Sequence, residues 1–90
     1  MDNTLQFLST TAQANIPFAA HLHVQDDNYS TDYYGYAERG TNSIDEQKFF
    51  IRRVQTDLAS DITTNMFSNG TMDRNVRFTD ATEINYYFLK

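Results

Sequence analysis

Two histidines, His21 and His23, are the residues whose spacing most resembles a metal or acid–base site. In a strand, side chains at positions i and i+2 project from the same face, and the aspartates Asp26, Asp27 and Asp32 follow closely. A first-row metal site needs a third protein ligand at a defined position, and the chain offers no further histidine and no cysteine. We therefore expect two imidazoles on the polar face of a strand, with no metal and no cofactor.

Nucleophilic and phosphate-handling chemistry has no matching pattern in this chain. No serine lies in a G-x-S-x-G elbow or a Ser-x-x-Lys pair. The three glycines stand apart, and no Walker-type lysine follows any of them. A chain of 90 residues also has little room for an enclosed active site. We expect a protein that is not an enzyme.

The stretch from residue 26 to residue 39 holds four of the six tyrosines, among Asp, Asn, Ser and Gly. This mixture is typical of binding loops, because tyrosine offers a large rigid contact area while small polar residues adapt to a partner. The alternative is ordinary cross-strand aromatic packing, which would bury these rings. The predicted partner-binding residues are Asp26, Asp27, Tyr29, Asp32, Tyr34 and Tyr36.

The charge balance limits the kind of partner. Twelve acidic and seven basic residues give a net charge of −5. This argues against direct binding to nucleic acid or to an anionic membrane, and it fits a partner whose own surface is basic. The absence of cysteine, of a signal-peptide pattern and of a long apolar run predicts a cytoplasmic protein that does not span a membrane.

The elements that position these residues follow from the hydrophobic spacing. Ser43 and Glu46 match a capping box, and Asn69-Gly70 matches a helix end. The apolar residues between them recur every three or four positions, which predicts a main helix from Ser43 to Gly70. These apolar residues are Phe50, Ile51, Val54, Leu58, Ile62 and Met66.

The rest of the chain is predicted to form short β-strands. Residues 18–25 alternate as a half-buried strand, and residues 33–38 form a second strand in which Gly35 marks a bulge or a close approach. The connection 26–32 is longer than most hairpin loops. Residues 75–79 and 84–89 predict a C-terminal hairpin, with a final helix starting at Asp80 as the alternative.

These elements predict a single α+β domain spanning residues 1–90, in the order α-β-β-α-β-β. A small antiparallel sheet of three to four strands would pack against one long helix. For residues 3–14, a short amphipathic helix and an N-terminal arm docked on the core are competing interpretations.

In size, charge and composition, the chain resembles the small acidic, cysteine-free proteins that phages and other mobile elements encode to block host machinery, anti-CRISPR proteins among them. The resemblance carries over no individual residue. It implies a non-enzymatic inhibitor or modulator of a larger nucleic-acid-handling protein or nucleoprotein complex, in the host cytoplasm if phage-encoded. The protein would be a monomer or a homodimer. The alternatives are a small-ligand or metal-dependent module using His21 and His23, and a homodimeric structural subunit.

Overall fold

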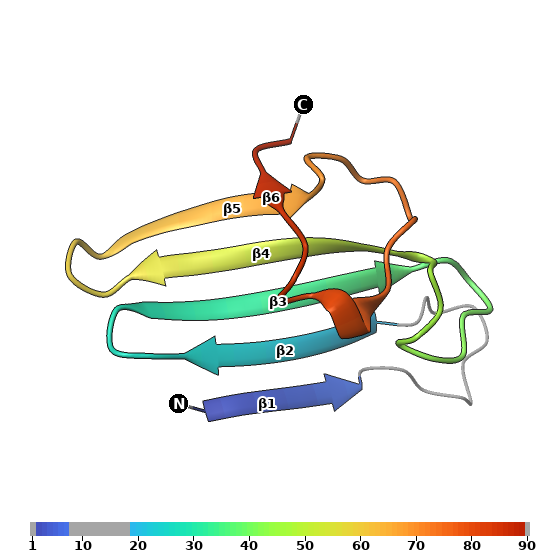
Figure 1. Ribbon diagram of the computed structural model, residues 1–90, viewed down its shortest axis with the longest axis horizontal. Helices are drawn as coiled ribbons and strands as arrows, with labels where there is room; N and C mark the ends of the chain where they lie inside the picture. The colour runs from blue at the N-terminus through green and yellow to red at the C-terminus, as the bar shows by residue number, and fades with distance from the viewer. Residues whose placement is uncertain (1, 8–18, 90) are drawn as a thin grey trace.

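The computed structural model describes residues 2–7 and 19–89, which form a six-stranded antiparallel sheet in which each strand pairs with the next along the chain (Figure 1). A one-turn 3-10 helix, η1 (Phe78–Asp80), precedes the last strand. The strands are β1 (Asp2–Phe7), β2 (Ala19–Gln25), β3 (Tyr29–Ala37), β4 (Phe49–Asp57), β5 (Ile62–Ser68) and β6 (Tyr86–Tyr87). No helix formed by the described residues is long and apolar enough to cross a membrane.

The predicted α+β fold is wrong, because the segment expected to be the main helix is the β4–β5 hairpin. A spacing of four, as between Phe50 and Val54, is a multiple of two and therefore suits one face of a strand as well as a helix. The segment is also rich in Ile, Val and Thr, whose branched side chains favour strands. Its turn is built by Asp57, whose Oδ1 accepts hydrogen bonds from the N–H groups of Ala59 at 2.9 Å and Ser60 at 3.4 Å.

The sequence signals for the two helix ends form turns instead. The Glu46 carboxylate accepts hydrogen bonds from the backbone N–H groups of Asn42 at 2.6 Å and Ser43 at 3.0 Å, as a capping box would. No helix follows this turn, and β4 begins at Phe49. Residues 69 and 70 have φ values of 54° and 73° and turn the chain away from the end of β5.

The two strands predicted before this hairpin are confirmed for residues 19–25 and 33–37, and residue 18 lies outside the described part of the chain. Strand β3 starts earlier than expected, at Tyr29. The connection between the two strands is correspondingly short. Asp26 Oδ1 accepts hydrogen bonds from the N–H groups of Asn28 and Tyr29, both at 2.8 Å, and closes the turn. The predicted N-terminal helix is wrong for residues 3–7, which lie in β1; residues 8–14 lie outside the described part of the chain.

Neither prediction for the C-terminal segment is correct. Val76 forms only an isolated bridge with Phe49 of β4, and the single helical turn is η1. The last strand, β6, is two residues long and pairs with Phe67 and Ser68 of β5. The segment therefore lies across the sheet instead of forming a hairpin of its own, as Figure 1 shows.

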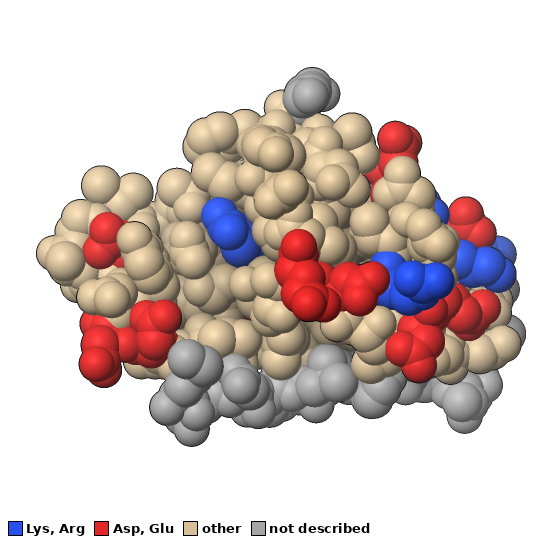
Figure 2. Space-filling view, viewed as in Figure 1, with Lys and Arg blue, Asp and Glu red and all other residues tan. Residues whose placement is uncertain are grey.

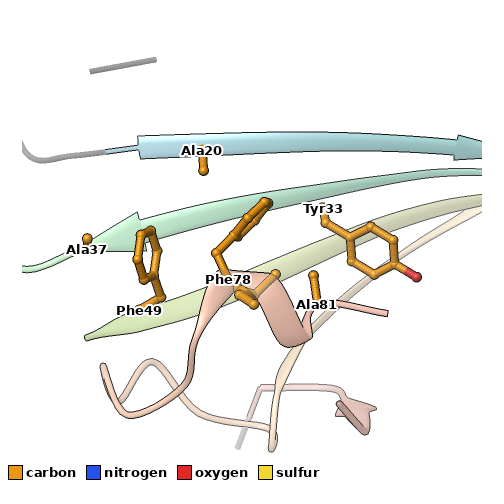
Figure 3. Packing of buried hydrophobic residues seen from close by; sticks show 7 residues of the cluster. Ala20, Tyr33, Ala37, Phe49, Phe78 and Ala81 are labelled. Atoms are coloured by element: carbon orange, nitrogen blue, oxygen red, sulfur yellow. The ribbon is translucent and has the colours of Figure 1, made fainter. Parts of the chain in front are cut away.

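The hydrophobic core lies on the face of the sheet that this C-terminal segment crosses. Phe78 and Ala81 point from it toward buried side chains of β2, β3 and β4 (Figure 3). A Cβ on Gly35 would overlap the Phe78 ring and press against Phe49, so the close approach predicted for this glycine is confirmed. The core cluster consists of Ala20, Tyr33, Ala37, Phe49, Ile51, Phe78 and Ala81.

The strand register assigns alternate side chains of the sheet to the opposite face. His21 of β2 pairs with Tyr34 of β3, which in turn pairs with Arg52 of β4. Directly opposed residues in an antiparallel sheet share a face, and none of these three belongs to the core cluster. We call this surface the His–Tyr face. Its residues in β2, β3 and β4 are Ala19, His21, His23, Gln25, Ser30, Asp32, Tyr34, Tyr36, Phe50, Arg52, Val54 and Thr56.

Candidate partner-binding face

A carboxylate held by two imidazoles occupies one part of the His–Tyr face. Asp32 of β3 lies opposite His23 of β2 in the strand register. Its Oδ1 atom is 2.7 Å from His21 Nε2 and 2.9 Å from His23 Nδ1. A carboxylate oxygen only accepts hydrogen bonds, so both contacts require a proton on the histidine nitrogen that faces Asp32. The second strand thus supplies an anionic partner for the His-x-His pair.

The environment of Asp32 favours its charged form. Partial burial acts to raise the pKa of this carboxyl, but the hydrogen bonds from His21 and His23 and their electrostatic attraction outweigh burial, so the pKa of Asp32 lies below its usual value. The side chains remain accessible, with exposed fractions of 20% for His21 and 28% for both His23 and Asp32. The cluster is therefore a partly exposed, hydrogen-bonded anion.

The ring of Tyr34 lies next to this cluster and between two planar groups. His21 stacks on it with ring centroids 4.8 Å apart and an interplanar angle of 14°. The Arg52 guanidinium carbon lies 4.9 Å from the centroid of the same ring, a distance at which a cation is attracted to an aromatic face. The three residues come from adjacent strands in direct register, so the sheet itself sets their order.

A second aromatic group adjoins Tyr34 toward the other end of the sheet. Tyr36 stacks on Phe50 at a centroid distance of 4.9 Å, and Phe67 of β5 contacts Phe50 at 6.2 Å. The Arg74 guanidinium carbon lies 5.3 Å from the Phe50 ring centroid. These contacts leave Phe50 only 6% exposed although it lies outside the core cluster. The His–Tyr face therefore has side-chain packing of its own.

Carboxylates gather at one end of the sheet, where the β2–β3 and β4–β5 turns lie. Asp26 and Asp27 are exposed in the first turn, and Asp61 is exposed in the second, next to Asp57. Figure 2 shows acidic residues over these turns, at the left end of the view, whereas acidic and basic residues are intermixed at the right end. Hydrogen bonds from the turn backbone lower the pKa of Asp26, so this carboxyl is charged at neutral pH.

The six predicted partner-binding residues fall in three places. Asp32, Tyr34 and Tyr36 share the His–Tyr face, as the alternation of β3 requires. Asp26 and Asp27 lie in the exposed β2–β3 turn.

Tyr29 is separated from Asp32, Tyr34 and Tyr36 by the parity of its position in β3. Odd-numbered residues of β3 face the core side of the sheet, and Tyr29 lines a depression of about 220 Å³ there, together with Gln55 and Ile62. This volume is below the roughly 300–1,000 Å³ of usual small-molecule sites. Neither histidine lines the depression, so it gives the ligand-binding alternative at His21 and His23 no support.

The geometry around the histidines also gives no support to a metal site. In the described part of the chain, no group of three or more His, Cys, Asp or Glu residues is arranged to hold a metal ion. His21 and His23 direct nitrogens to the same Oδ1 atom of Asp32, so a carboxylate oxygen occupies the point at which the two nitrogens converge.

The sequence prediction missed the β4, β5 and Arg74 side chains of the face. Phe50 was expected on the apolar face of the helix predicted from Ser43 to Gly70. Once residues 49–57 are recognised as a strand, the even-numbered positions follow each other on one face, and Phe50 and Arg52 become neighbours. The β-branched content of this segment was the available signal.

Comparison with known protein families, with curated proteins and with solved structures found no match to this chain.

Proposed function

We propose that this protein is a small, non-enzymatic binding domain whose His–Tyr face and acidic turns engage a larger protein that carries a basic surface. The proposal rests on the difference in side chains between the two faces of the sheet. One face holds the core, and the other presents Tyr34, Tyr36 and Arg52 in a contiguous array. Tyrosine and arginine are enriched among the residues that dominate protein–protein binding energies.

The charge distribution supports a basic partner. The chain carries a net charge of −5, and its exposed turns add Asp26, Asp27 and Asp61 beside the His–Tyr face. Such an arrangement speeds encounter with a positive surface and orients the complex. Proteins that handle nucleic acid present surfaces of this kind, because they neutralise phosphates with Lys and Arg. The proposed role is an inhibitor or modulator of such a protein, in the cytoplasm, as the resemblance to phage-encoded anti-defence proteins implies.

The test begins with identification of the partner and ends with a measured affinity. The immobilised protein is used to isolate partners from the native cell, each candidate is purified, and its binding is measured by calorimetry. Tyr34→Ala with Tyr36→Ala should weaken binding by at least about tenfold, as expected for central aromatic contacts. Asp26→Asn with Asp27→Asn should weaken it less and should reduce its dependence on salt.

Met72→Ala is the matched control, because Met72 is 53% exposed and lies in the segment after β5, outside the sheet. It should bind as the unmodified protein does. Each variant is first compared with the unmodified protein in thermal unfolding, so that loss of binding is not loss of fold. Equal affinity of the tyrosine variant and the control would overturn the proposed face. Direct binding of a single-stranded oligonucleotide, measured by fluorescence anisotropy, would overturn the choice of a protein partner.

A further inference from the structure

The outer edge of β5 has no strand beside most of its length. β6 pairs only with Phe67 and Ser68, and among the described strands none lies beside residues 62–66 on that side. Beyond β6 the chain turns away from β5, as Figure 1 shows. This edge is separate from the His–Tyr face, because it is formed by backbone groups in the plane of the sheet.

The backbone groups that this edge presents follow from the hydrogen-bond pattern. Alternate residues of an antiparallel strand direct both of their backbone groups toward the same neighbour. The Asn69 N–H donates to the Asn85 carbonyl at 3.0 Å, on the β6 side of the sheet. The odd-numbered residues of β5 therefore face outward, and Thr63 and Asn65 each present an N–H and a C=O to the edge. Thr64, by contrast, faces β4.

The edge lacks the features that usually prevent strands from pairing with other chains. Exposed edges are commonly protected by lysine, proline, a bulge or very short length. The run Ile62-Thr63-Thr64-Asn65-Met66 contains no charged residue and no proline. It pairs regularly with β4, without a bulge in the register.

Exposed apolar side chains flank the two ends of this edge. At the start of β5, Leu58 is 45% exposed and Ile62 is 61% exposed. At the other end, Tyr87, Phe88 and Leu89 are 51%, 63% and 47% exposed. Covering apolar side chains of this size by a neighbouring molecule lowers the free energy of the system.

We infer that the occupant of this edge is a second copy of the chain, paired antiparallel to β5 about a two-fold axis at Thr64. In this register Thr63 of one copy pairs with Asn65 of the other, and the two pairs exchange four backbone hydrogen bonds. The same register brings Ile62 of one copy beside the end of β6 of the other, where Phe88 is exposed. The apolar side chains at the two ends thus cover each other.

The charge pattern agrees with a second copy despite the net charge of −5. The paired segment is uncharged, so no like charges oppose each other along it. The antiparallel arrangement also keeps the acidic turns of the two copies at opposite ends of the joined edge. A two-fold interface of this kind is closed, since each copy uses its β5 edge once.

Concentration-dependent hydrogen exchange of individual amides tests this inference. Between about 20 µM and about 1 mM, protection of the Thr63 and Asn65 amides should rise by at least about fivefold, because their N–H groups become paired. The Thr64 and Met66 amides, which face β4, should be protected throughout. Over the same range, light scattering should show the mass rising from that of one chain, 10.5 kDa, toward twice that value.

The variants Asn65→Pro and Asn65→Ala distinguish the contribution of the Asn65 backbone N–H to association from that of its side chain. The Asn65 N–H is not used by β4, so an edge proline keeps the pairing of the single chain and removes the donor between copies. Asn65→Pro should weaken association by at least about tenfold, and Asn65→Ala should leave it within about twofold. A single-chain mass at about 1 mM would overturn the inference. Association that leaves the Thr63 and Asn65 amides unprotected would also overturn the inference. This second result is obtained with the unmodified protein, so it does not depend on the folding of the proline variant.

Discussion

Asp32 is the residue on which the polar contacts of the His–Tyr face converge. Its Oδ1 atom accepts a hydrogen bond from each of two imidazoles, at 2.7 and 2.9 Å. The sequence places His21 and His23 on one face by their spacing, but Asp32 joins them only because β3 folds back in register. An i, i+2 pattern cannot predict which residue of the next strand lies opposite.

Replacing Asp32 by asparagine should destabilise the protein in a pH-dependent way. The pKa of Asp32 in the folded protein lies below the unfolded value of about 3.9. Its contribution to stability is therefore complete above about pH 4 and is lost as pH falls through the folded-state pKa. At pH 7, Asp32→Asn should lower the free energy of unfolding by about 1 kcal/mol, the order expected for partly exposed hydrogen bonds to a charged group. Urea denaturation at about pH 7, 5 and 3 measures the difference.

Asp27→Asn is the control for this experiment, because Asp27 is an exposed aspartate in the neighbouring turn. It should change the free energy of unfolding by less than about 0.5 kcal/mol at each pH. A deficit of Asp32→Asn that persisted unchanged at low pH would show that the charge of Asp32 does not stabilise the fold.

At the scale of elements, the β4–β5 hairpin shows why the helix prediction failed. Phe50, Val54, Ile62 and Met66 were assigned to one helix face by their spacing of four. In the structure Asp57 pairs with Ile62 and Arg53 pairs with Met66, so odd-numbered residues of β4 share a face with even-numbered residues of β5. Phe50 and Val54 therefore lie on the His–Tyr face, whereas Ile62 and Met66 lie on the core side. Spacing alone could not locate the turn, which depends on Asp57 and on the positive φ of 60° at Asp61.

Gly35→Ala tests the close approach of η1 to β3. The added Cβ would overlap the Phe78 ring and press against Phe49, and both rings are buried in the core. Overpacking of this kind typically costs about 1–3 kcal/mol. We expect a loss of stability in the upper part of that range, measured by urea denaturation.

Phe78→Leu provides the matched partner for a double-mutant cycle with Gly35→Ala. A smaller side chain at position 78 leaves room for the new Cβ, so the double variant should be more stable than the sum of the two single effects predicts. Additive effects would contradict a direct contact between Gly35 and Phe78.

At the scale of the whole molecule, the sequence predicted a part of the site better than it predicted the fold. Three of the six proposed residues, Asp32, Tyr34 and Tyr36, share one face because the alternation of β3 is a local property. Tyr29 lies on the other side, and Arg74 reaches the face from beyond β5; both depend on register and on the path of the chain. Long-range pairing of this kind is not encoded in any short window of sequence.

The overall dimensions show that this is a thin molecule, 42 × 29 × 19 Å. Stacked layers of a protein lie about 10 Å apart, so the shortest dimension admits one sheet and a single covering layer. In the described part of the chain, that layer over the core is the segment that carries Val76, Phe78, Ala81 and Ile84. Cooperative folding should therefore depend strongly on this short segment.

Phe78→Ala and Phe88→Ala test this dependence with the same chemical change at two sites. Phe78 is 1% exposed and contacts Phe49 at a centroid distance of 5.9 Å, whereas Phe88 is 63% exposed. Removing a buried phenylalanine costs about 3–5 kcal/mol, a large part of the roughly 5–13 kcal/mol available to a chain of this size. Phe88→Ala, measured at low concentration where the chain is single, should cost less than about 0.5 kcal/mol. Urea denaturation followed by tyrosine fluorescence measures both. Of these two residues only Phe78 lies in the core. Equal effects of the two substitutions would therefore mean that packing of the C-terminal segment on the core does not stabilise the fold.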